Sequence, residues 1–271
     1  MGARLTPLLY LAAGLFGATA VGVLLYLTVS FFLMRAYVEP RSARATLREL
    51  VRETFWVVLT QPLVPLYYVR GHAMGGDGPG DVIVFVHGYF QNRANFLGLA
   101  RGIRHAHVGP MYGFNYPWLS RVEKNAERLA AFVEKVCAAS GREHVALVAH
   151  SLGGLVALEY MQSEAGARRV RKCVTIASPH AGISWKGPIL GWVGEQMRSG
   201  SAWLTDRAGR KIEVPTLSIY STHDNMVHPP TTSQLAMRGG RDLAVEGLGH
   251  LAILFDPKVV GAVVEFLRAS P

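Results

Sequence analysis

The longest hydrophobic stretch of the chain lies at its N-terminus. From Leu5 to Met34 the sequence holds 30 residues without a single charge. As a helix these would extend roughly 45 Å, more than the ~30 Å hydrocarbon core of a bilayer. Ala18-Thr19-Ala20 has the form of a signal-peptide cleavage site, but the apolar run continues for 14 residues beyond it, which disfavours a cleaved signal. The pattern predicts an uncleaved transmembrane anchor over residues 1–36.

A second helical pattern follows over residues 42–59. Arg44, Arg48 and Arg52 fall along one side of the expected helix, and another side carries the apolar residues Leu47, Leu50, Val51, Phe55 and Val58. Such an apolar side could lie on lipid headgroups or pack against the rest of the protein, and the pattern leaves both open. Two prolines end the helix and the glycine-rich residues 71–80 predict a turn. Residues 37–80 are therefore predicted to be a connector.

Short apolar stretches alternate with helical patterns through residues 81–271. The predicted strands are residues 81–88, 107–116, 145–150, 171–177, 214–220 and 242–246. Helices are expected over residues 92–104, from about 120, after 151, and from Asp256 to about Leu267. Ser120 and Glu123 have the spacing of a capping box at the start of the second helix. This alternation predicts an α/β domain with a mostly parallel sheet and helices on both faces.

The most informative segment joins residues 145–150 to the helix that follows. In Ala149-His150-Ser151-Leu152-Gly153 small residues stand two before and two after the serine. This is the G-x-S-x-G pattern with alanine at its first position; there, the serine occupies a strained turn that holds its hydroxyl clear of the sheet. For this motif alone, the alternative is a serine that simply caps a helix. The pattern makes Ser151 the candidate nucleophile.

Four other motifs accompany this segment. They are Val86-His87-Gly88-Tyr89, Thr175-Ile176-Ala177-Ser178-Pro179-His180, Ser221-Thr222-His223-Asp224-Asn225-Met226-Val227-His228 and Gly247-Leu248-Gly249-His250. Through these motifs, residues 81–268 resemble the α/β-hydrolases, and within that fold the bacterial triacylglycerol lipases and related esterases. The resemblance implies an α/β-hydrolase domain over residues 81–271 that cleaves carboxylic esters through a serine nucleophile. It does not extend to the N-terminal apolar stretch or the connector.

A serine nucleophile needs an acid and a base, which follow it in the order acid, then histidine, in α/β-hydrolases. Asp224 comes shortly after a predicted strand, so it is expected at the carboxyl end of the sheet, where such sites gather. Asp224-Asn225 is also a good turn former, and an Asx turn is an alternative that can coexist with catalysis. Asp206 has no buried strand before it, and Asp256 precedes a proline and better suits a helix N-cap.

His250 is the candidate base because it lies in the loop after the last predicted strand. His223 and His228 flank the acid closely in sequence and are expected to line the mouth of the site or to be solvated. His150 is expected beneath the turn, and His87 to brace the neighbouring loop. The backbone N–H of Leu152 is expected to donate a hydrogen bond to the oxyanion. By the resemblance, the N–H of Tyr89 is the second donor.

Residues 181–213 separate two predicted strands and are predicted to form a small cap. They contain the tryptophans Trp185, Trp192 and Trp203. The apolar residues of this region either bind an acyl chain, with a possible contact to a membrane, or provide ordinary packing for a helical insertion. The sequence supports both equally.

Charge and composition restrict the partners. The formal net charge is +9 over 271 residues, but no run of interleaved basic and aromatic residues indicates a nucleic-acid surface. Five arginines between Arg35 and Arg52 follow the apolar run, against Arg4 before it, and the positive-inside rule then places the catalytic domain on the cytoplasmic side. The two cysteines, Cys137 and Cys173, lack metal-ligand spacing.

Together these features predict a membrane-anchored serine hydrolase of the lipase or esterase type, acting on esters with apolar acyl chains. Ser151 attacks the carbonyl, His250 moves the proton and Asp224 stabilises the imidazolium. No metal or organic cofactor is expected. An acyltransferase or thioesterase with the same three residues is one alternative. A membrane-tethered hydrolase fold that binds acyl groups without catalysis is another.

Overall fold

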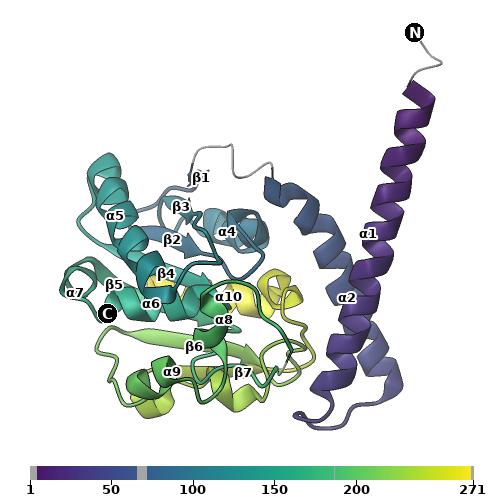
Figure 1. The fold of residues 1–271 in the computed structure, drawn as a ribbon. Helices are drawn as coiled ribbons and strands as arrows, with labels where there is room; N and C mark the ends of the chain where they lie inside the picture. The colour runs from purple at the N-terminus through teal and green to yellow at the C-terminus, as the bar shows by residue number, and fades with distance from the viewer. Residues whose placement is uncertain (1–4, 66–71, 186, 270–271) are drawn as a thin grey trace.

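A computed structural model describes residues 5–65, 72–185 and 187–269. Within these residues one sheet has the strand order β1-β3-β2-β4-β5-β6-β7 (Figure 1). The strands are β1 (Ala73–Gly75), β2 (Val82–Val86), β3 (Met111–Phe114), β4 (Val145–His150), β5 (Val170–Ile176), β6 (Thr216–Ser221) and β7 (Arg241–Val245). The edge strand β1 pairs antiparallel with β3, and the other pairs are parallel. The prediction of a mostly parallel sheet is confirmed.

Helices cover both faces of this sheet. One face packs against α5 (Val122–Ser140) and α6 (Leu152–Met161), and the other against α4 (Leu97–His105) and α10 (Pro257–Arg268). In β2 the side chains of Val82, Val84 and Val86 belong to the first core, whereas Ile83 and Phe85 belong to the second. This alternation explains why β2 is apolar at every position and β4 at all but its last: both strands are buried from both sides.

The structure corrects one predicted helix start and confirms another. The capping box of Ser120 and Glu123 is wrong, because α5 begins at Val122 and its N-cap residue makes no side-chain cap. The free N–H of Val122 instead donates to Gln196 Oε1 at 2.8 Å. A side chain distant in sequence thus replaces the local cap. At α10 the side chain of Asp256 accepts hydrogen bonds from the first turn, as its predicted N-cap role requires.

Two helices, α1 (Leu5–Met34) and α2 (Ala43–Thr60), form a hairpin along one side of the domain (Figure 1). Among the described residues, no helix reaches the combination of length and apolar character that crossing a bilayer demands. The transmembrane anchor predicted over residues 1–36 is therefore not supported. The C-terminal end of α1 packs on the domain: Leu27, Phe31 and Met34 are buried.

The helix α2 turns three polar residues toward the domain. Glu49, Glu53 and Thr60 are buried, and Trp56 stacks on Phe255 with ring centroids 3.8 Å apart. Its outward side carries the stripe Leu47, Val51, Phe55 and Leu59, each between 52% and 60% exposed. We call these four residues the α2 stripe. Of the predicted apolar side, Leu47, Val51 and Phe55 are therefore exposed, whereas Leu50 and Val58 are half-buried.

The remaining elements connect these parts. After α2 come η2 (Gln61–Leu63) and then β1, so a strand lies within the glycine-rich region predicted as a turn. The predicted cap over residues 181–213 contains α8 (Val193–Met197) and α9 (Ala202–Arg207). The others are η3 (Arg93–Phe96), α7 (Glu164–Arg169), η4 (Pro230–Ser233), η5 (Ala236–Arg238) and η6 (Ala252–Phe255). Arg4, residues 66–71 of the predicted connector and residue 186 of the cap lie outside the described residues.

Candidate active site

Ser151 occupies a strained turn between β4 and α6. Its backbone has φ 54° and ψ −128°, a region that is costly for a residue with a side chain and that persists only where the surroundings enforce it. The Ser151 N–H donates to the carbonyl of Ile176 at 2.9 Å. A Cβ at Gly153 would lie 2.1 Å from the carbonyl oxygen of Val86. Glycine there lets α6 pack directly on β2.

The alternative of a simple helix cap does not describe Ser151. The residue stands at the N-cap position of α6, but its side chain makes no capping hydrogen bond. A capping serine normally has extended backbone angles and accepts a hydrogen bond from the first turn. The strained backbone and the unused cap are the geometry expected of a G-x-S-x-G turn.

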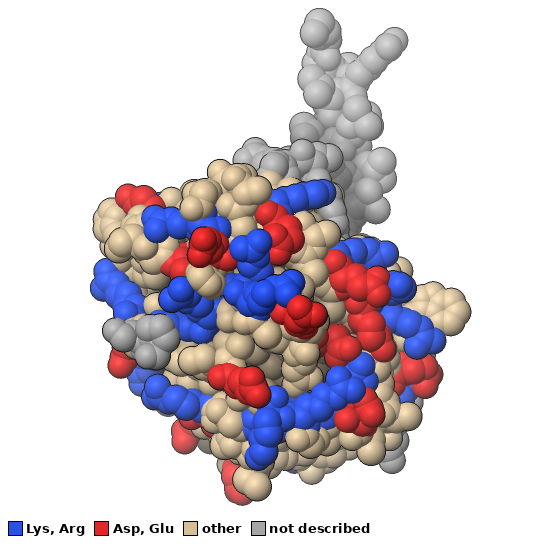
Figure 2. Space-filling view, turned by 90° about the vertical axis from the view of Figure 1, so that its left-hand side faces the viewer, with Lys and Arg blue, Asp and Glu red and all other residues tan. Residues whose placement is uncertain are grey.

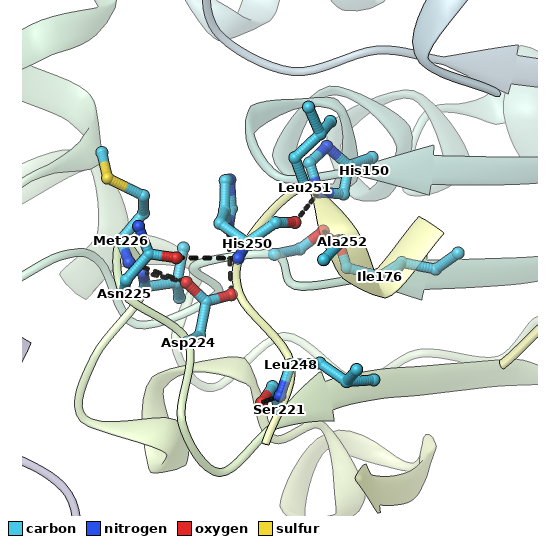
Figure 3. A network of polar contacts seen from close by, with 12 residues as sticks. His150, Ile176, Ser221, Asp224, Asn225, Met226, Leu248, His250, Leu251 and Ala252 are labelled. Carbon is cyan, nitrogen blue, oxygen red and sulfur yellow. Dashed lines mark hydrogen bonds and ion pairs between the residues drawn. The ribbon is translucent and has the colours of Figure 1, made fainter. Parts of the chain in front are cut away.

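Asp224 and His250 form a hydrogen-bonded pair in the loops after β6 and β7. His250 Nδ1 donates to Asp224 Oδ2 at 2.9 Å (Figure 3). The other oxygen of Asp224 accepts the N–H groups of Met226 and Val227, both at 2.8 Å. Asp224 therefore makes an Asx turn and orients the histidine at the same time. With its proton on Nδ1, the neutral imidazole presents Nε2 as an acceptor.

The surroundings of His250 favour its protonated form. Burial lowers the pKa of His250, but the charge and hydrogen bond of Asp224 and the charge of Glu53 raise it, and the net pKa is above the ordinary value. A base that receives a proton during reaction needs this stabilisation of the imidazolium.

The backbone of His250 is fixed at two points. Its N–H donates to Asn225 Oδ1 at 2.9 Å, and its carbonyl oxygen lies 2.9 Å from His150 Nε2 (Figure 3). The rings of His150 and His250 have centroids 4.7 Å apart. Since His150 directly precedes Ser151, these contacts bring the loop of the candidate base to the turn of the candidate nucleophile.

The loop after β2 passes close to Ser151. A Cβ at Gly88 would lie 2.7 Å from Ser151 Cβ, so only glycine fits. Gln91 holds this loop, because its Oε1 accepts the Gly88 N–H at 2.9 Å and lies 2.8 Å from His150 Nδ1. Tyr89 and Leu152, the predicted oxyanion donors, follow Gly88 and Ser151 directly.

The other predicted histidines have structural contacts. Burial lowers the pKa of His87 to about 4, and its Nε2 accepts the N–H of Tyr116 at 3.2 Å, so it braces the loop as expected. His223 and His228 are buried rather than solvated. Arg41 contacts His223 at 3.3 Å, and Tyr37 stacks on His228 with centroids 4.6 Å apart. Both histidines thus contact the segment between α1 and α2.

Comparisons agree with this architecture. The family model described as the alpha/beta hydrolase fold matches residues 81–199. The chain has the α/β-hydrolase fold. Aspergillus fumigatus lipase B is a similar structure, with 19% identity and a TM-score of 0.64 over 74% of this chain and 56% of that one. This chain thus spans little more than half the length of that lipase.

Two bacterial structures are similar over nearly their whole length. Bacillus licheniformis lipase BlEst2 has 15% identity and a TM-score of 0.60, with 72% of this chain and 95% of that one covered. The carboxylesterase CesB (YbfK) from Bacillus subtilis has 16% identity and a TM-score of 0.52, covering 84% of this chain and all of that one. At these identities the likeness establishes the fold.

Within this α/β-hydrolase fold, the loops after β2 and β3 meet the predicted cap at an apolar surface. Tyr89 Oη donates to the carbonyl of Leu190 at 2.8 Å, and the Trp192 N–H donates to the carbonyl of Leu119 at 2.9 Å. Phe90, Leu119, Leu190 and Trp192 are all exposed, Trp192 by 71%. We call these four residues the apolar mouth. It adjoins Tyr89, one of the predicted oxyanion donors.

The excess positive charge does not gather on the face shown in Figure 2. Basic and acidic side chains are interspersed there (Figure 2). Elsewhere in the described residues, ion pairs such as Arg169 with Glu134 at 2.6 Å and Lys124 with Glu127 at 2.9 Å also balance charge. A nucleic-acid surface would be a continuous basic stripe, which this face lacks.

Proposed function

We propose that this protein is a serine hydrolase of carboxylic esters, with Ser151 as nucleophile, His250 as base and Asp224 as the group that orients the base. The observation that carries the proposal is the hydrogen bond between Asp224 and His250 at 2.9 Å, in a loop fastened to the residue before a strained serine. Nucleophile, base and orienting acid are the groups that acyl transfer requires. The lipase and esterase neighbours support the same reaction.

In this mechanism Ser151 Oγ attacks the ester carbonyl while His250 Nε2 takes its proton. The N–H groups of Leu152 and Tyr89 donate to the oxyanion; each such donor is typically worth about 100- to 1000-fold in rate. The imidazolium then protonates the leaving alcohol, and the acyl-enzyme forms. Water, deprotonated by His250, releases the acid and restores the serine. None of these steps requires a metal or organic cofactor.

The acyl part of the substrate is proposed to be apolar. The apolar mouth exposes Phe90, Leu190 and Trp192 beside Tyr89. Covering this surface with an acyl chain would remove apolar area from water at about 25 cal/mol per Å². The proposed substrates are therefore esters of medium or long acyl chains, including lipids.

The test compares the protein with its Ser151→Ala variant on nitrophenyl esters of increasing acyl length. Hydrolysis and labelling by a serine-directed phosphonate should both disappear in the variant, and kcat/KM should rise with acyl length. Equal rates from the two proteins would refute the role of Ser151. Absence of labelling in both would assign a non-catalytic acyl-binding protein. Product formed from an added alcohol or thiol in preference to water would assign an acyltransferase.

We also propose that α2 places the protein on a lipid surface. The α2 stripe faces outward, whereas an amphipathic helix normally buries its apolar side. Arg44 and Arg48 are exposed on the same helix, so the exposed face combines apolar and basic side chains. This combination matches a surface of anionic lipid.

Sedimentation with vesicles of phosphatidylglycerol and phosphatidylcholine tests the surface proposal. Replacement of Leu47, Val51 and Phe55 by serine should lower the bound fraction at least tenfold, because three large side chains lose their burial, each worth about 1.5–3 kcal/mol. Met237→Ser is the matched control, since Met237 is 89% exposed on η5. Equal binding by the triple variant and the wild type would refute the proposal.

A further inference from the structure

The buried carboxylate of Glu53 contacts the loop that carries His250. Glu53 comes from α2, outside the region that matches the hydrolase family, and is only 2% exposed. Its Oε1 accepts the N–H of Leu251 at 2.8 Å and its Oε2 accepts the N–H of Ala252 at 2.8 Å. The two residues that follow the candidate base are therefore both bound by one side chain.

The fit is tight on the other side of the histidine as well. A Cβ at Gly249 would lie 2.4 Å from Glu53 Oε2, so the glycine before His250 leaves room for this carboxylate. The helix α1 fastens the opposing loop, because Asn225 Nδ2 donates to Ser30 Oγ at 2.8 Å while Asn225 Oδ1 accepts the His250 N–H. The N-terminal hairpin thus contacts the loops of both the acid and the base.

Glu53 also acts on the imidazole through its charge. The titratable groups that face His250 are Asp224 from the loop after β6, Glu53 from α2 and His150 at the end of β4. Burial raises the pKa of Glu53 to about 7, although the two backbone hydrogen bonds and His250 lower it. Above that pH the carboxylate is ionised beside the group that becomes cationic during reaction.

We propose that Glu53 is a positioning residue of the hydrolase site: it fixes the backbone after His250 and supplies a second negative charge that stabilises the imidazolium. The proposal rests on the proposed function, since it assigns Glu53 a role in the reaction of Ser151. Its stability role alone would not need a charge, because a buried carboxylate costs several kcal/mol in desolvation. A neutral acceptor could satisfy the N–H groups of Leu251 and Ala252 without the cost of desolvating a charge.

The test is the pH dependence of kcat/KM for Glu53→Gln, with Glu49→Gln as the matched control. Glu49 is buried on the same side of α2 but pairs with Arg41 at 3.2 Å. Glutamine at 53 keeps one acceptor for the loop and loses the charge. We expect kcat/KM to fall roughly tenfold at its plateau. The acid limb of the pH profile, where kcat/KM falls as His250 becomes protonated, should move to lower pH by about half to one unit, because the imidazolium loses a stabilising charge. The control should leave the limb in place.

Labelling of Ser151 by a phosphonate, followed against pH, gives a second measure of the same limb without turnover. Glu53→Asp retains the charge and should keep the limb close to its wild-type pH. If Glu53→Gln does not fold, Gly249→Ala displaces the carboxylate from the opposite side and should move the limb in the same direction. An unmoved limb in the folded variants, with the wild type active, overturns the role of Glu53 alone. Inactive wild type overturns the proposed function instead.

Discussion

The sharpest test of the proposed site is Asp224→Asn. The carboxylate accepts three hydrogen bonds, two from the backbone at Oδ1 and one from His250 at Oδ2. In the variant, the two backbone N–H groups select the amide oxygen for the Oδ1 position, since the reverse orientation would set an NH₂ group against two donors. The amide nitrogen then faces His250 Nδ1 and donates to it.

This orientation forces the proton of His250 onto Nε2. A neutral imidazole carries a proton on one nitrogen only, so Nε2 can no longer accept the proton of Ser151. The equivalent change in a serine-protease triad lowers kcat about 10⁴-fold. We expect a loss of about 10³- to 10⁴-fold in kcat/KM, which corresponds to roughly 4–5.5 kcal/mol of transition-state stabilisation.

The assay is nitrophenyl ester hydrolysis at the plateau pH, with thermal unfolding measured on the same samples. Because both backbone hydrogen bonds survive, the melting temperature should change little. Asp242→Asn is the matched control: its carboxylate also accepts two backbone N–H groups, from Leu235 at 2.8 Å and Ala236 at 3.2 Å. The control should keep activity within about twofold, because its carboxylate holds the segment of η5 rather than His250. Retention of a tenth or more of the wild-type rate by Asp224→Asn would refute the assignment.

Three further predictions follow from the geometry around Ser151. Gly88→Ala places a Cβ 2.7 Å from Ser151 Cβ. The resulting shift of Ser151 should lower kcat/KM about 100-fold, while the circular dichroism spectrum should remain that of the folded protein. Gly153→Ala sets a Cβ 2.1 Å from a backbone oxygen of β2 and should destabilise the protein by about 1–3 kcal/mol in urea unfolding; an unchanged midpoint would contradict the packing. The base must be neutral to accept a proton, and the pKa of His250 is raised from 6.5, so kcat/KM should fall with decreasing pH through a midpoint above 6.5; a midpoint below that value would exclude the stabilised imidazolium.

The sequence was sufficient for the strands β2 to β7 and for the pairing of Asp224 with His250, but not for β1, which lies in the region predicted as a turn. The central strands β2 and β4 are apolar at consecutive positions because both faces are covered. The three candidate residues follow strand ends in the order of a known fold. Gln91 and Asn225 were missed, although both hold site residues in place. Asparagine and glutamine are common in loops, and local sequence does not show which of them is buried.

The contact of Glu53 could not be predicted for a different physical reason. It joins residues 198 and 199 positions apart in sequence, and a glutamate in an amphipathic pattern normally marks the solvent side. The capping box at Ser120 failed in the same way, because Gln196 supplies the hydrogen bond from 74 residues away. Periodicity predicts that a side is polar or apolar, but the tertiary structure decides which side is buried.

The orientation of α2 connects the two proposals made for this helix, the lipid contact of its stripe and the positioning role of Glu53. Its outward stripe is apolar and its inward side presents Glu53 to the loop of His250. In water alone this arrangement is unfavourable on both sides: the stripe stays hydrated and the carboxylate is desolvated. A lipid surface would remove the cost of the exposed stripe, and the proposed role of Glu53 in orienting His250 would explain why the desolvated carboxylate is retained. Because the same helix makes both contacts, lipid binding that holds α2 in place also holds His250. We therefore expect anionic vesicles to raise kcat of the wild type. The serine substitutions in the α2 stripe should lower vesicle binding and reduce this rise, whereas Met237→Ser should alter neither.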